Sequence, residues 1–175
     1  MKKNGGGFAD AGHSTAARSK KYQALKAQQQ IGYQSFEKGY GQEQHEGHFD
    51  WYIFPSYSVS HKDISIDYKN RQDRNVLAAL LKDHDYMKKY DDAVKKYTEF
   101  ITNPPKGATY DDLFAGSKLL RFGKVIQSLA GFYKAAISVK DTGIAEDCLR
   151  LFNGLNECLE CNDREKVKLH NGLKE

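Results

Sequence analysis

Helical periodicity of the apolar residues is the feature that most limits the fold of this chain. Side chains recur at spacings of three and four, as they do in helices that bury one face. The clearest series is Tyr86, Tyr90, Val94, Tyr97 and Ile101. Pro104 and Pro105 follow this series, and because proline cannot continue a helix, we expect the helix to end there. The pattern predicts packed helices rather than a sheet.

The same periodicity predicts helices on both sides of this one. Residues 20–38 fit one helix, and residues 76–81 form an apolar face that is followed by a break around Asp83. Residues 119–137 and 144–159 carry two further apolar stripes. We therefore expect a mainly α fold.

Three shorter signals complete this prediction. Thr109 and Asp163 are predicted N-caps, the second of a short last helix that runs through residue 173. Residues 63–69 alternate polar and apolar side chains, which predicts a short strand or an extended segment. Together these patterns predict a single compact helical domain over residues 21–175, with a short extended or β segment.

Residues 1–20 differ from the rest in composition and predict a flexible N-terminal arm. Up to residue 21, five basic residues stand against the single acid Asp10, among glycines and serines. These five are Lys2, Lys3, Arg18, Lys20 and Lys21. Such an arm can bind an anionic surface, either nucleic acid or an acidic protein, or it can be a solubilising tail without a partner.

Composition also limits the class of protein. The 175 residues contain no apolar run of the roughly 20 residues that a membrane span needs, and no apolar centre of a secretory signal. The three cysteines, Cys148, Cys158 and Cys161, favour reduced thiols over a disulfide framework. We expect a soluble intracellular protein, with the cytoplasm favoured and an organelle left open.

The most specific motif lies in residues 47–56, which read Gly-His-Phe-Asp-Trp-Tyr-Ile-Phe-Pro-Ser. This run resembles the pattern Ser-His-Trp-x-Trp-x-Ile-Phe-Pro-Gln of a little-characterised branch of the NADAR superfamily, a branch defined by a domain of unknown function. Five positions match outright. They are His48, Trp51, Ile53, Phe54 and Pro55. The first and last positions differ, since Gly47 and Ser56 replace serine and glutamine.

A second part of the resemblance lies downstream. Residues 112–115 and 120–122 read Asp-Leu-Phe-Ala and Leu-Arg-Phe, where the family has an acid before Ile-Phe-Gly and then Leu-Lys-Phe. Arg121 keeps the positive charge of that lysine. Two serines of the family are replaced by Lys124 and Val125, so any function of those hydroxyls is absent here.

The resemblance implies a NADAR-like helical domain that binds an ADP-ribose-like or nucleotide-derived ligand and hydrolyses an N-glycosidic bond. Such chemistry needs a carboxylate, a cation for phosphate, and aromatic walls for the base. The candidate carboxylates are Asp50 and Glu37. The candidate ligand-binding residues are His48, Trp51, Phe54, Arg121 and Lys124. No cofactor and no metal site are predicted.

Each assignment has an alternative. Aromatic residues such as Trp51 and Phe54 usually pack in a core, Asp50 can point to solvent, and His48 can bond a backbone carbonyl. The whole domain can also be a catalytically inactive structural or binding subunit of a larger assembly, anchored by its basic arm. A nucleic-acid-binding protein is a third interpretation, and whether the chain is an enzyme stays open.

Overall fold

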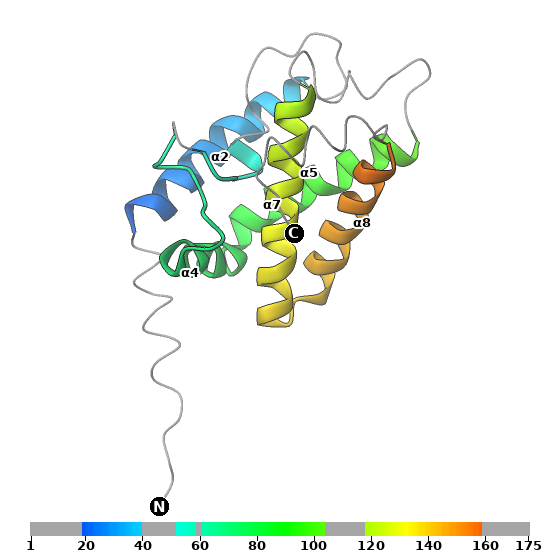
Figure 1. The fold of residues 1–175 in the computed structure, drawn as a ribbon. Helices are drawn as coiled ribbons and strands as arrows, with labels where there is room; N and C mark the ends of the chain where they lie inside the picture. The colour runs from blue at the N-terminus through cyan, green and yellow to red at the C-terminus, as the bar shows by residue number, and fades with distance from the viewer. Residues whose placement is uncertain (1–18, 40–51, 59–60, 104–117, 159–175) are drawn as a thin grey trace, which may run out of the picture.

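Five helices make up most of the part of the chain that the computed structural model describes, residues 19–39, 52–58, 61–103 and 118–158. They are α2 (Lys20–Gly39), α4 (Arg71–Leu81), α5 (His84–Thr102), α7 (Lys118–Val139) and α8 (Thr142–Cys158). α7 and α8 lie side by side and antiparallel, and α5 passes behind them (Figure 1). α4 contacts α7 and α5, and α2 contacts α4 and α5.

The prediction of a mainly helical domain is confirmed. Each of the five described helices overlaps a range that the apolar periodicity indicated. The predicted segment at residues 63–69 forms neither helix nor strand, and the structure has no strand anywhere in its described ranges. The predicted caps Thr109 and Asp163 and the predicted arm up to residue 18 lie outside those ranges.

Polar side chains fix where three of the helices begin. Asn70 precedes α4 and accepts hydrogen bonds from the backbone N–H groups of residues 72 and 73. Asp83 precedes α5 and accepts from the N–H of Tyr86 at 3.0 Å, and Asp141 accepts from Ile144 N–H at 3.2 Å at the start of α8. These caps bond amides that have no partner within the helix. The side chains at residues 83 and 141 therefore fix where one helix ends and the next begins.

An aromatic core joins α2, α5 and α7. Tyr90 of α5 stacks on Phe132 of α7 with ring centroids 4.0 Å apart, while Tyr97 stacks on Phe36 of α2 at 5.9 Å. Phe54 packs edge-on against both tyrosines, at 5.4 and 5.3 Å. All five side chains are almost completely buried. The segment that carries the sequence motif is therefore part of the hydrophobic core.

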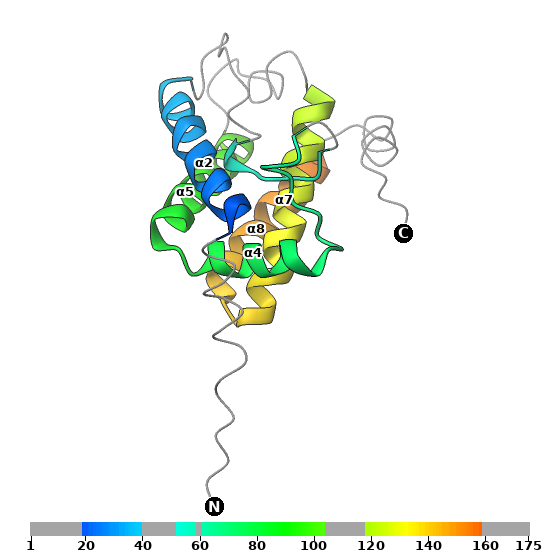
Figure 2. The same ribbon diagram turned by 90° about the vertical axis from the view of Figure 1, so that its left-hand side faces the viewer.

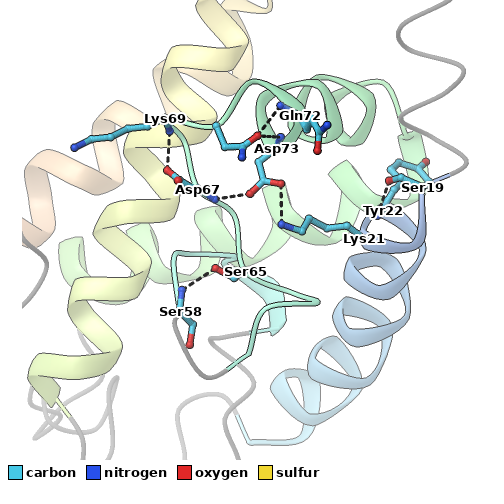
Figure 3. Close-up of polar contacts among 10 residues, drawn as sticks. Ser19, Lys21, Tyr22, Ser58, Ser65, Asp67, Lys69, Gln72 and Asp73 are labelled. Atoms are coloured by element: carbon cyan, nitrogen blue, oxygen red, sulfur yellow. Dashed lines mark hydrogen bonds and ion pairs between the residues drawn. The ribbon is translucent and has the colours of Figure 1, made fainter.

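Asp73 ties α2 to the segment before α4 (Figure 3). Its side chain is buried, and its two oxygens accept from Lys21 Nζ at 2.7 Å and from Asp67 N–H at 2.8 Å. Lys21 lies in the first turn of α2, and Asp67 lies three residues before the cap of α4. One carboxylate of α4 thus connects α2, through a residue 52 positions away, with the segment just before α4.

Asp83 makes a second connection to α2. Besides capping α5, it accepts from Lys26 Nζ at 2.5 Å and from the hydroxyl of Tyr22. Burial alone raises the pKa of Asp83, but the hydrogen bonds from Lys26, Tyr22 and the Tyr86 amide, with the charge of Lys26, outweigh it and lower the pKa to about 2. The folded state therefore favours the ionised carboxylate.

The stability of the chain should for this reason depend on Asp83 in acid. A carboxyl group whose pKa is lower in the folded than in the unfolded state contributes stability above its unfolded pKa, and loses it as the pH falls through the folded value. We expect Asp83→Asn, which keeps a good capping side chain, to lower the free energy of unfolding by about 1–2 kcal/mol at about pH 6.

That difference should close between about pH 4 and pH 2, where wild-type Asp83 itself becomes protonated. Urea unfolding of both proteins across this range measures it. A difference that stays constant with pH would contradict the role given to the charge of Asp83.

Candidate functional site

The N-terminal half of α7 carries two buried basic side chains. Arg121 and Lys124 are only 6% and 7% exposed, and a spacing of three residues places them on the same side of the helix. The first turn of α7 contains no acidic residue. Because the helix dipole is positive at this end, the two cations add to a field that already favours an anion. This half of α7 is thus suited to bind a negatively charged group.

Burial changes the protonation equilibrium of Lys124. It lowers the pKa of Lys124 below its ordinary value, because a charged amine loses hydration inside the protein. A bound phosphate would offset this effect, since its negative charge stabilises the ammonium group.

Residues 52–58, which include the described part of the sequence motif, residues 52–56, lie beside α7 (Figure 2). Tyr57 N–H donates to Gln127 Oε1 at 2.6 Å, and the hydroxyl of Tyr68 donates to the carbonyl oxygen of Pro55 at 2.7 Å. A Cβ atom at Gly131 would lie 1.9 Å from the ring of Tyr68, so only glycine leaves room for this ring. The segment is thus bonded to α7 directly at Tyr57, and its Pro55 is bonded to Tyr68, whose ring packs on α7 at Gly131.

A polar stripe continues along α7 behind the cations. Ser128 follows Lys124 by four residues and is completely buried, and its Oγ lies 3.3 Å from the hydroxyl of Tyr90. Burial raises the pKa of Tyr90 well above its ordinary value, so this phenol stays protonated. The stripe of Arg121, Lys124 and Ser128 therefore consists of groups that can donate hydrogen bonds.

The predicted site residues that the structure describes do not all lie together. Arg121 and Lys124 lie on the same side of α7. Phe54 lies in the core against Tyr90 and Tyr97, completely buried, so its ring presents no face to a ligand and the packing alternative describes it. This position corrects the expectation that Phe54 walls a binding pocket, and the physical reason is the edge-on contact with two tyrosines.

Glu37 is exposed in the last turn of α2, at the same end of the molecule as the first turns of α7 (Figures 1 and 2). The structure does not bring Glu37 into a described contact with Arg121 or Lys124. His48, Asp50 and Trp51 lie outside the described residues, so their predicted roles stay predictions.

Sequence reasoning did not identify Tyr68, Gln127 or Ser128. Tyr68 belongs to an alternating segment, and Gln127 and Ser128 fall between the apolar positions of α7. The signal in the sequence for Ser128 is its position four residues after Lys124, which continues the same side of the helix as Arg121 and Lys124.

Within the described ranges, no group of three or more histidine, cysteine or acidic side chains could hold a metal ion. None of the described helices is long and apolar enough to cross a membrane. Comparison of the chain with protein-family models, with curated proteins and with solved structures gives no match. The resemblance to the NADAR superfamily therefore stays a prediction.

Proposed function

We propose that this chain binds an ADP-ribose-like or nucleotide-derived ligand at the N-terminal half of α7, with hydrolysis of an N-glycosidic bond as its reaction. Arg121 and Lys124 hold the phosphates in this proposal. The observation that carries it is the burial of two cations on one side of α7, one turn before Gln127, which accepts a hydrogen bond from Tyr57 N–H. Both cationic side chains can form charge-assisted hydrogen bonds with an anionic ligand such as a phosphate.

The rest of the ligand would contact residues of the motif. Trp51 immediately precedes the described segment 52–58 and His48 lies three residues earlier, and this segment is bonded to Gln127 of α7 and to Tyr68. In the proposal Trp51 stacks on the base and His48 bonds the ligand, while Asp50, or Glu37 from the end of α2, activates water. Phe54 supports this segment from the core and does not touch the ligand.

Calorimetric titration of the full chain with ADP-ribose tests the phosphate site. We expect Arg121→Gln and Lys124→Gln each to weaken binding by about 10- to 100-fold, because a hydrogen bond between charged groups contributes about 1.5–3 kcal/mol. Lys88→Gln is the matched control, since Lys88 is an exposed lysine of another helix, α5. It should bind as the wild type does.

Thermal unfolding of each variant separates a loss of ligand contacts from a loss of fold, because both cations are buried. If both folded variants bound ADP-ribose with the affinity of the wild type, the ligand would bind at another site than Arg121 and Lys124. A wild-type chain that does not bind ADP-ribose would contradict the proposed ligand.

A catalytically inactive NADAR-like subunit of a larger assembly is the second candidate. It is favoured by Lys124 and Val125, both buried where the resembling family has serines, and by the buried Ser56 where that family has glutamine. Chromatographic analysis of N-glycosidic substrates such as ADP-ribosylated nucleosides distinguishes the two candidates. Binding of ADP-ribose without release of a base would favour this second candidate.

A further inference from the structure

The outer face of the α7–α8 pair carries two exposed aliphatic side chains. Five large hydrophobic side chains are exposed among the described residues, and three of them belong to this pair. Ile137 is 53% exposed and Leu149 is 41% exposed, whereas the third, Val139, follows Ile137 by two residues and therefore lies on the other side of α7. Exposed apolar side chains that lie together are typical of surfaces that bind another protein.

A small cavity opens on the same face, between the two helices. Its volume is about 200 Å³, and its walls include Ala130 and Tyr133 from α7 and Leu149 and Phe152 from α8. Ile137 lies four residues after Tyr133, so it stands on the same side of α7 as the cavity. One face therefore carries both a projecting aliphatic side chain and an apolar hollow that can receive one.

Charges of opposite sign border this face. Lys134 lines the cavity from α7, and Glu146 lies one turn before Leu149 on α8. The two helices are antiparallel and are joined by only two residues (Figure 1), so both charges lie near the connected end of the pair, one on each helix. Among the described residues neither side chain forms an ion pair.

We propose that this face binds a second copy of the chain through a two-fold axis. An isologous interface needs a surface that complements itself, since each patch meets its own copy. The α7–α8 face meets this requirement in shape and in charge. The axis would place α7 over α8 of the other copy, with Ile137 of the partner subunit in the cavity and Glu146 of the partner subunit opposite Lys134.

Sedimentation velocity of the full chain tests this interface, with a reductant present so that cysteines do not crosslink the copies. We expect a dimer that dissociates at micromolar concentration, as small interfaces do. Leu149→Lys and Ile137→Lys should each raise the dissociation constant by at least about tenfold, because each dimer then buries two unpaired charges. Ile31→Lys is the matched control, since Ile31 is 54% exposed but lies on α2.

A charge exchange tests the pairing. Lys134→Glu alone and Glu146→Lys alone should each weaken the dimer, because each places like charges opposite one another. The chain that carries both substitutions should regain the wild-type dissociation constant to within about threefold. A wild-type chain that stays monomeric at about 100 μM, or a dimer that Leu149→Lys leaves intact, would overturn the proposal.

Discussion

Gly131→Ala is expected to destabilise the chain by about 2–4 kcal/mol, although the same substitution inside an exposed helix usually stabilises by up to about 1 kcal/mol. The added Cβ would lie 1.9 Å from the ring of Tyr68, which is far inside contact distance. The ring cannot move without breaking the hydrogen bond from its hydroxyl to Pro55, and the loss of a buried bond adds to the cost. Urea unfolding of the variant measures the change.

Two controls isolate the contact. In a chain that already carries Tyr68→Ala the ring is absent, so Gly131→Ala should become neutral or stabilising there. Gly154→Ala on α8 meets only Ile101, whose terminal Cδ1 lies 2.4 Å from the added Cβ and belongs to a flexible side chain. Its effect should be smaller than that of Gly131→Ala. Equal losses at Gly131 with and without the Tyr68 ring would show that this contact is not the cause.

Asp73→Ala should lower the free energy of unfolding by about 2–3 kcal/mol. The substitution removes the acceptor of both Lys21 Nζ and Asp67 N–H, and it leaves these donors without the partner that joins α2 to the segment before α4. Chemical unfolding followed by circular dichroism gives the value. Asp73→Asn keeps an oxygen acceptor but loses the charge, so its effect should be intermediate.

Asp91→Ala provides the comparison for this prediction. Asp91 pairs with Lys95 one turn away on α5, and the lysine side chain is 61% exposed. An exposed pair of this kind contributes about 0.3–0.5 kcal/mol. If Asp73→Ala lost no more stability than Asp91→Ala, the connection through Asp73 would have no special importance for the fold.

The helices could be predicted from the sequence because each carries a regular apolar stripe. The side of α5 that faces the core is the one that the spacing indicated, with Tyr86, Tyr90, Val94 and Tyr97 buried. Asp83 caps the start of α5 and so marks the break after α4. The possible strand at residues 63–69 does not form, since these residues lie in turns and irregular structure. Side chains of this segment hold turns instead, because Ser65 accepts from the N–H of Ser58 and the Tyr68 hydroxyl donates to the carbonyl oxygen of Pro55.

The candidate site was predictable only in part. Arg121 and Lys124 could be placed on one side of a helix from their spacing alone, but nothing in the sequence indicated that both would be buried. Long-range partners such as Gln127 with Tyr57, or Gly131 with Tyr68, leave no periodic signal. The motif match at Phe54 is compatible with a ring that lines a ligand pocket and with a ring that packs in the core. The contacts with Tyr90 and Tyr97 identify the second role.

The short link between α7 and α8 bears on the order in which the chain assembles. Lys140 and Asp141 alone join these helices, so their pairing closes a small loop at little entropic cost. The contact of Tyr57 with Gln127 spans 70 residues, and those of α2 with Asp73 and Asp83 span more than 50. Because contacts of low sequence separation close at the smaller entropic cost, we expect α7 and α8 to pair before α2 and the segment 52–58 reach their places.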